Sequence, residues 1–485
     1  MNTYWSIMKL KFIYLFASLV FISFQSTAID LHECRIGEDT SPVKILAECG
    51  HLSVAENRNN PDRMINLNIA IIRSQSSKKK SDPVIMLAGG PGQAAIEAYP
   101  RAATAFKNIL KHRDVVLVDQ RGTGGSNKIS CDFNQETRDR IEQDQSLIPD
   151  EFKKCVAKLD ADTRYYTTQE SIKDLEQVRK ALNIEKWNLI GVSYGTRKAS
   201  TYIKMFPESI RSVILDSVVP HQEPLAQNHE KNLVNALRKQ FEQCEKQPAC
   251  HDAFGDVEQQ MWELIDRVDQ EKPTIKLQNF STGKYEEITM TKEYLTLAIR
   301  MLAYSPQTMR ILPLLIAKAN HGQLETIAAQ AKMIESMMGD SLSNVELSIL
   351  CAEDLPFYDK EYIVNDNNLF GKDLLEVVKK NCEVWPHIVV DASFKDPVVS
   401  DLPVLLLSGE LDPVTPPKFA ETAMQTLSNS QHLVAKGQGH NIFHLGCMPD
   451  IIAEFIDDPE QELNTECMQN FNYTPFFINM MGPEQ

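Results

Sequence analysis

Residues 187–195 read Trp187-Asn188-Leu189-Ile190-Gly191-Val192-Ser193-Tyr194-Gly195, and no other part of the sequence is as informative. An apolar run leads directly into a serine that stands between two glycines, which is the pattern of a strand turning sharply into a helix. Such a bend exposes the serine hydroxyl, and the glycines let strand and helix approach each other without Cβ collisions. The pattern predicts Ser193 as a nucleophile. A plain Gly/Ser loop after a strand is the alternative.

A serine nucleophile needs a base and an orienting acid, and both candidates come late in the chain. A strand predicted at 404–407 runs into the loop of Asp412, and a strand predicted at 431–435 leads into the loop of His440. The imidazole would take the hydroxyl proton, and the carboxylate would orient the imidazole and stabilise its charged form. The order Ser, Asp, His is that of an α/β-hydrolase, not of chymotrypsin-like or subtilisin-like enzymes. The alternative for Asp412 is an ordinary solvated loop carboxylate.

A glycine-rich turn after another predicted strand supplies a candidate oxyanion hole. The apolar strand at 84–87 ends in Ala88-Gly89-Gly90-Pro91-Gly92, where backbone N–H groups can approach a negatively charged oxygen. Because Pro91 has no N–H, Gly90 is the better donor, paired with the amide of Tyr194 immediately after the nucleophile. A purely structural Gly/Pro turn is the alternative.

A fourth segment follows the strand predicted at 115–118 and reads Asp119-Gln120-Arg121-Gly122-Thr123-Gly124-Gly125-Ser126. We expect a structural role for it, in which Asp119 and Arg121 cross-link loops beside the pocket.

Together, these segments resemble the proline iminopeptidase group of α/β-hydrolase serine peptidases, and most of all its secreted tripeptidyl aminopeptidase branch. The matching motifs are Gly89-Gly90-Pro91-Gly92, the run at 119–126, Gly191-Val192-Ser193-Tyr194-Gly195, and the loops of Asp412 and His440. Ala88 and Tyr194 replace the His and Trp that are usual in proline iminopeptidases, which favours the tripeptidyl branch. The resemblance implies an α/β fold, with a mostly parallel central sheet, helices on both faces and an inserted, mainly helical cap.

The spacing of the motifs predicts how the chain is divided. A signal peptide is expected at 1–28, the first part of the hydrolase core at 29–222, the cap at 223–395 and the second part of the core at 396–485. The cap is placed where apolar residues recur at helical intervals, as in 257–268, between strands of the core.

The amino terminus predicts export. Lys9 and Lys11 precede an apolar stretch from Phe12 to Phe24, and Ser26-Thr27-Ala28 forms a small-residue cleavage site. The apolar core is shorter than the roughly 20 residues of a spanning helix, so cleavage is favoured over an uncleaved anchor. We therefore expect a periplasmic or extracellular protein with no stable membrane anchor after cleavage.

The ten cysteines form an even set in a chain predicted to reach an oxidising compartment. Their spacing lacks the histidines of a zinc site, so we expect disulfides and no metal. Many connectivities are possible, and the simplest joins neighbours in sequence. Those pairs are Cys34–Cys49, Cys131–Cys155, Cys244–Cys250, Cys351–Cys382 and Cys447–Cys467.

The formal net charge of −16 argues against nucleic acid and anionic membranes as partners. The expected partners are peptides with a free N-terminus. An exopeptidase must recognise an α-ammonium, so acidic side chains from the cap are expected in the pocket. The resemblance to the tripeptidyl branch points to Glu353 and Asp354, next to Cys351, for this role. An exposed carboxylate pair at a helix end is the alternative.

These observations favour an exported serine aminopeptidase that works through an acyl-enzyme and needs no cofactor. A secreted carboxylesterase or lipase of the same fold is the alternative enzyme, because an acyl-enzyme can form from an ester as well as from an amide. A catalytically silent binding protein on this fold is the third hypothesis, and the complete set of Ser193, His440 and Asp412 argues against it.

Overall fold

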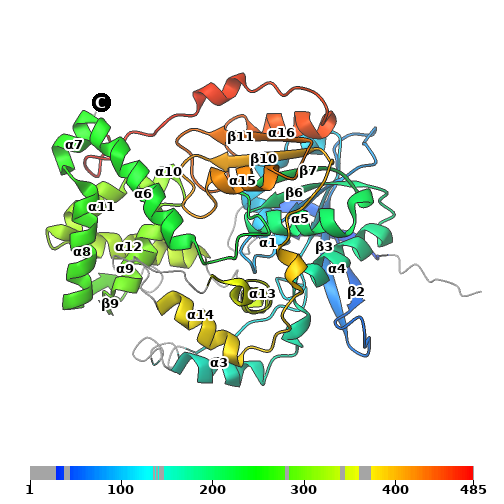
Figure 1. Cartoon of the computed structure of the whole chain (residues 1–485), viewed down its shortest axis with the longest axis horizontal. Helices are drawn as coiled ribbons and strands as arrows, with labels where there is room; N and C mark the ends of the chain where they lie inside the picture. Colours follow the sequence, from blue (N-terminus) through cyan, green and yellow to red (C-terminus); the bar gives the residue numbers. More distant parts are fainter. Residues whose placement is uncertain are drawn as a thin grey trace, which may run out of the picture.

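A computed structural model gives the architecture, with a twisted central sheet, helices against it and a second group of helices to one side (Figure 1). It describes residues 29–37, 44–134, 137, 140, 147–278, 283–338, 344–359 and 373–483. The predicted signal peptide at 1–28 lies outside the described residues.

The main sheet has nine strands in the order β1-β2-β3-β5-β4-β6-β7-β10-β11. The first pairs, from β1 to β5, are antiparallel, and every pair from β5 to β11 is parallel. The mostly parallel sheet confirms the predicted α/β class. The strands are β1 His32–Ile36, β2 Ile45–Ala55, β3 Met64–Ile72, β4 Val84–Leu87, β5 Val115–Val118, β6 Trp187–Val192, β7 Ile210–Asp216, β10 Val404–Gly409 and β11 Ser430–Ala435.

Helices cover both faces of this sheet, and the alternation of side chains along the strands shows how. In β10, Leu405 and Leu407 pack in one apolar cluster, while Val404 and Leu406 pack in another on the opposite face. The first cluster includes residues of α1 (Ala95–Ala102) and α16 (Met448–Asp457), and the second includes residues of α4 (Thr168–Ala181), α5 (Tyr194–Met205) and α15 (Pro417–Met424). Strands buried on both faces explain the continuous apolar runs in the sequence.

The middle of the chain forms helices with an apolar core of their own, in the region predicted as a cap (Figure 1). A short antiparallel hairpin, β8 and β9, packs with them. The elements are α6 His229–Lys246, α7 Pro248–Phe254, α8 Val257–Glu271, β8 Thr274–Gln278, β9 Tyr285–Thr289, α9 Lys292–Leu302, α10 Pro306–Met309, α11 Leu312–Asn320 and α12 Glu325–Met338.

A second helical group follows, with α13 (Val345–Ile349), a π-helical turn at Leu350–Asp354, and α14 (Asp373–Val384). Its apolar cluster also takes in residues of α3 (Ile148–Val156), which comes much earlier in the chain. Trp385 meets Phe152 of α3 edge to face, with ring centroids 6.2 Å apart. The predicted boundary at 222 therefore falls between α3 and the α13–α14 group, although these segments pack together.

Five disulfides join all ten cysteines, each to its neighbour in sequence. The pairs are Cys34–Cys49, Cys131–Cys155, Cys244–Cys250, Cys351–Cys382 and Cys447–Cys467. Across the described ranges, no helix has the length and apolar character needed to cross a bilayer. The same part of the chain holds no cluster of His, Cys, Asp and Glu that could bind a metal ion.

Candidate active site

Ser193 lies at the bend between β6 and α5, with φ 55° and ψ −124°. Its N–H donates to the Asp216 carbonyl at 2.8 Å, and its carbonyl accepts from the Thr196 N–H at 2.8 Å. Two glycines make this bend possible. A Cβ on Gly195 would lie 2.0 Å from the Leu87 carbonyl oxygen, and one on Gly191 would lie 2.5 Å from the Gly195 carbonyl oxygen. The nucleophile elbow predicted from the sequence therefore has the backbone that this motif requires.

His440 and Asp412 come together from the loops after β11 and β10. The Nδ1 of His440 lies 2.8 Å from the Asp412 Oδ2, within hydrogen-bond distance. The loop of His440 is also held from the cap side, since its backbone N–H donates to the Tyr304 carbonyl at 2.8 Å. The rings of Tyr304 and His440 meet edge to face, with centroids 5.3 Å apart.

The Asp412 carboxylate is fully buried and has a complete set of donors. Its Oδ1 accepts from the N–H groups of Val414 and Thr415, and its Oδ2 accepts from the Thr415 hydroxyl, each at 2.8 Å. Burial raises the pKa of this carboxyl, but His440 and the backbone donors together lower it by more. The net pKa therefore lies below its usual value. Asp412 is thus held as a carboxylate.

The imidazole of His440 experiences the opposite balance. Burial lowers its pKa, while the Asp412 carboxylate raises it by more, so the net pKa lies above the ordinary value. Asp216 adds to the rise and Arg300 opposes it. A base whose charged form is stabilised in this way is suited to accept a proton from a hydroxyl.

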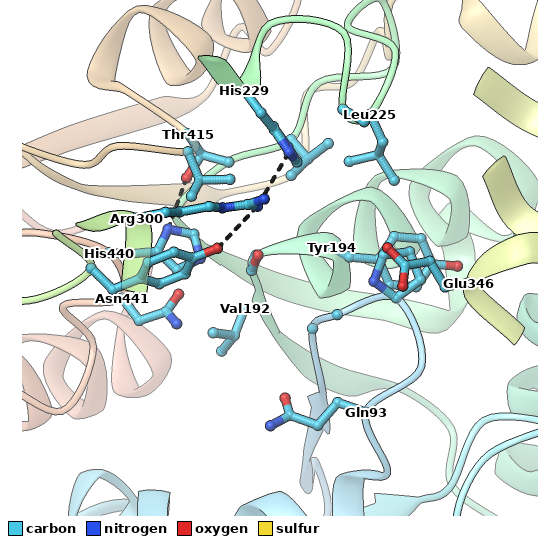
Figure 2. A pocket seen from close by; sticks show the side chains of 18 of the residues that line it. Gln93, Val192, Tyr194, Leu225, His229, Arg300, Glu346, Thr415, His440 and Asn441 are labelled. Carbon is cyan, nitrogen blue, oxygen red and sulfur yellow. Dashed lines mark hydrogen bonds between the residues drawn. The ribbon is translucent and has the colours of Figure 1, made fainter. Parts of the chain in front are cut away.

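A cavity of about 550 Å³ opens at the carboxyl ends of the parallel strands, and Ser193, His440, Gly90 and Tyr194 all line it. Figure 2 shows His440, Arg300 and Thr415 towards one side of this cavity and Tyr194 with Glu346 towards the other. Among the described residues, the Ser193 hydroxyl makes no hydrogen bond with His440. Such bonds often tighten only when substrate is bound.

The glycine-rich turn after β4 runs directly beside the nucleophile. A Cβ on Gly89 would lie 3.1 Å from the Ser193 Cβ, so this turn must be free of side chains to approach so closely. Gly90 has φ +103°, a conformation that strongly favours glycine. Tyr194 is the first residue of α5, and the N–H groups of a helix's first turn have no partner within the helix. Both residues predicted as oxyanion donors thus border the cavity.

The structure places Glu353 and Asp354 outside the cavity wall. Both are fully buried in the π-helical turn. Glu353 accepts from the N–H and the hydroxyl of Thr168, at 2.6 and 2.7 Å. Asp354 accepts from Arg197 and Lys395, at 2.9 and 2.6 Å. Thr168 belongs to α4 and Arg197 to α5, so the two acids join the π-helical turn to these helices. Buried donors already satisfy both carboxylates.

Glu346 is a cavity residue that the sequence analysis missed. It lies on α13, its side chain is accessible, and it lines the cavity together with Arg300 and His229. Although this side chain is exposed to the cavity, the protein around it partly desolvates the carboxyl and raises the pKa of Glu346, and Arg300 opposes this rise. Only its tertiary position distinguishes it among the 66 aspartates and glutamates of the chain.

Asp119 and Arg121 tie distant segments together, as expected for a structural role. Asp119 accepts from the N–H groups of Ile96 and Gly125, at 2.9 and 3.1 Å. Arg121 is fully buried, and its Nε and Nη2 donate to the Asp174 carboxylate at 2.6 and 2.7 Å.

The putative hydrolase YuaR of Escherichia coli K12 is 29% identical over 206 residues, which span 41% of each chain. Serine protease Hip1 of Mycobacterium tuberculosis is 23% identical over 463 residues, with 87% of each chain covered. The tripeptidyl aminopeptidase of Streptomyces lividans is 28% identical over 190 residues, or 36% of this chain and 35% of that one.

Among solved structures, the proline iminopeptidase of Mycobacterium smegmatis aligns at 14% identity with a TM-score of 0.37, over 84% of this chain and 98% of that one. The relatives confirm the resemblance drawn from the sequence motifs. The α/β hydrolase fold family matches residues 82–446, and the chain belongs to this family.

Proposed function

We propose that the protein is an exported serine aminopeptidase that hydrolyses peptide bonds near a free N-terminus, in the manner of tripeptidyl or prolyl aminopeptidases. The observation that carries the proposal is the 2.8 Å contact between His440 and Asp412 at a cavity that Ser193 also lines. The five disulfides fit an oxidising compartment and thus export. Relatives named serine protease and tripeptidyl aminopeptidase support the peptidase class.

In this proposal, the Ser193 oxygen attacks the scissile carbonyl while the His440 Nε2 takes the hydroxyl proton. The amides of Gly90 and Tyr194 donate to the oxyanion of the tetrahedral intermediate. His440 then passes its proton to the leaving amine, the C–N bond breaks, and an acyl-enzyme on Ser193 remains. Water attacks that ester with His440 again as the base, which releases the acid and restores the hydroxyl. Asp412 keeps the imidazole in the required tautomer throughout.

The free N-terminus needs a counter-charge, and among the described residues that line the cavity Glu346 supplies the carboxylate. A substrate α-ammonium placed against it would form a charge-assisted hydrogen bond in partly desolvated surroundings. The predicted role of Glu353 and Asp354 in this recognition stays a prediction. Their buried partners Thr168, Arg197 and Lys395 make Glu346 the better candidate.

An exported carboxylesterase or lipase is the second candidate. It is favoured by the apolar part of the cavity wall, to which Val219, Leu225, Leu297, Met301 and Leu350 contribute. An acyl group without a charged end would suit these side chains, because burying apolar surface favours binding without any counter-charge.

Matched substrates distinguish an aminopeptidase from an esterase or lipase. We expect alanyl-alanyl-alanine p-nitroanilide with a free amine to be cleaved faster than its N-acetyl form. Glu346→Gln should lower kcat/KM for the free peptide about 10- to 100-fold, the value of a hydrogen bond to a charged group, and should leave the acetylated peptide unchanged. The control is Glu293→Gln, which removes an exposed carboxylate from α9. Equal rates with free and acetylated peptides, together with faster cleavage of p-nitrophenyl esters, would instead establish the esterase.

A further inference from the structure

Asp216 is a buried acid that the proposed mechanism does not use. It is the last residue of β7, and β7 lies between β6, which carries Ser193, and β10, which leads to Asp412. Its side chain has no exposed surface. An ionisable group this deep needs hydrogen-bond partners to offset the cost of its burial.

Those partners are backbone groups in the loop of His440. The Asp216 Oδ1 accepts from the Ile442 N–H, and its Oδ2 accepts from the Phe443 N–H, each at 3.1 Å. The neighbouring Ser217 adds a third bond, since its hydroxyl oxygen accepts from the Asn441 N–H at 2.8 Å. The amides of the first, second and third residues after His440 are thus all bound to the end of β7.

The backbone of Asp216 holds the other half of the site. Its carbonyl accepts from the Ser193 N–H at 2.8 Å, so one residue is bonded both to the turn of the nucleophile and to the loop of the base. Ser217 has φ 61° and donates its own N–H to the Leu407 carbonyl of β10 at 2.9 Å, which fixes the end of β7 in the sheet.

We propose that Asp216 is a positioning residue that sets the placement of the His440 imidazole relative to the Ser193 hydroxyl and supports the imidazolium with its negative charge. The inference rests on the catalytic roles proposed above for Ser193 and His440. It assigns to Asp216 a geometric task, because a shift of about 1 Å at a reacting group can reduce the rate about 10²-fold.

Several charged or titratable groups surround His440, and they include Tyr304, whose ring packs against the imidazole. The others are Asp412 after β10, Asp216 on β7, Arg300 on α9 and His229 on α6, as far as the described residues show. Asp412 and Asp216 raise the pKa of His440, whereas Arg300 lowers it. Burial raises the pKa of Asp216 itself to about 7, against the lowering by its two amide donors and by His440, so its charge supports the imidazolium at pH values above about 7.

Two substitutions separate geometry from charge. In Asp216→Asn the amide nitrogen cannot accept, so the N–H of Ile442 or Phe443 loses its acceptor and the charge is lost as well. In Asp216→Glu the charge remains, but the longer side chain displaces the loop. We expect kcat to fall about 10- to 100-fold in both variants. Only in Asp216→Asn should the acid limb of kcat/KM against pH move to lower pH, because a group that raises the pKa of the base is gone.

The measurement uses the full-length mature enzyme and alanyl-alanyl-alanine p-nitroanilide. Rates are expressed per Ser193 labelled by a fluorophosphonate after labelling has gone to completion, so that neither misfolded molecules nor slow labelling of a variant affects kcat. Asp114→Asn is the matched control. Asp114 is also buried and hydrogen-bonded, but it precedes β5, at the end of the parallel strands opposite to the cavity. This control should keep both kcat and the pH limb of the wild type.

Wild-type kcat per labelled serine together with an unmoved acid limb in Asp216→Asn would overturn the inference. If that variant does not fold, Asp216→Glu and Ser217→Ala decide, since each disturbs the anchoring of the loop and should lower kcat without moving the limb. Wild-type kcat in both would also overturn it. A failure of the proposed function would give a different result. Either Ser193 of the wild type would not be labelled, or the substitution His440→Ala would not slow the labelling of Ser193.

Discussion

Arg197 places its Nη1 at 2.9 Å from both carboxylate oxygens of Asp354, and neither side chain has exposed surface. The pair joins α5, the helix that starts at the nucleophile, to the π-helical turn at Leu350–Asp354. Lys395 donates to the same carboxylate at 2.6 Å, and the Leu225 N–H donates at 2.9 Å. One buried anion thus holds two cations and a backbone amide where the helical insert meets the core.

Asp354→Asn should strongly destabilise the protein. The amide carries no charge, so Arg197 would remain as a buried cation without its counter-ion, and breaking a buried pair from one side costs about 3–5 kcal/mol. Urea unfolding followed by circular dichroism measures the loss. The control is Glu258→Gln, which breaks the exposed 3.3 Å pair with Arg238 and should change stability by less than about 1 kcal/mol. Equal losses in the two variants would contradict the assigned role of Asp354.

The neighbouring Glu353 leads to a prediction about stability and pH. Burial raises its pKa to about 7, against the lowering by its bonds to Thr168. The folded protein therefore binds a proton at Glu353 more tightly than the unfolded chain does. The stability from this proton is fully present below the unfolded pKa and is lost as the pH rises towards about 7.

The substitution Glu353→Gln tests whether protonation of Glu353 makes stability depend on pH. The Gln amide can donate to the Thr168 hydroxyl, which can in turn donate to the Tyr194 hydroxyl 2.7 Å away, so the fold should tolerate the change. Relative to this variant, the wild type should lose on the order of 3 kcal/mol between pH 4 and pH 8. Unfolding free energies across that range give the difference. Parallel curves for the two proteins would show that Glu353 does not titrate in the way its surroundings imply.

The disulfides yield a prediction about relative stability. Cys351–Cys382 closes a sequence separation of 31 residues, whereas Cys244–Cys250 closes one of 6. In the chain-entropy account, the longer loop restricts the unfolded chain more, by about 1.5 kcal/mol. Replacing both cysteines of the longer loop by alanine should therefore lower the unfolding free energy more than the same change in the shorter loop. The reverse order would show that native-state packing dominates.

Much of the fold could be predicted because the central strands are buried on both faces. Four-residue apolar runs such as Val84–Leu87 and Val115–Val118 predict such buried strands. Each of these runs is followed by a turn whose residue types are restricted by chemistry or by close backbone approach. Ser193, Asp412 and His440 stand in such turns, so local sequence was enough to predict a role for all three.

The surroundings of the acidic residues could not be predicted in this way. Glu353 and Asp354 stand beside Cys351 in the sequence, but their environment depends on Thr168, Arg197 and Lys395, which are remote along the chain. A carboxylate on a cavity wall and one in a buried ion pair have the same sequence signature. Their placement follows from how the turn packs on α4 and α5, which is a tertiary property.

The pH dependence of the proposed reaction gives the most direct test of the pair formed by Asp412 and His440. The neutral imidazole is the active base, so kcat/KM should rise with pH through the pKa of His440, which Asp412 holds above its ordinary value. Asp412→Asn removes that carboxylate. The acid limb should then move to lower pH, and kcat should fall about 10⁴-fold because the tautomer is no longer fixed. Asp401→Asn, in the exposed loop before β10, is the control and should match the wild type in both. A normal limb in Asp412→Asn would contradict the assigned role of Asp412, because it is the carboxylate within hydrogen-bond distance of the His440 Nδ1 in the described part of the chain.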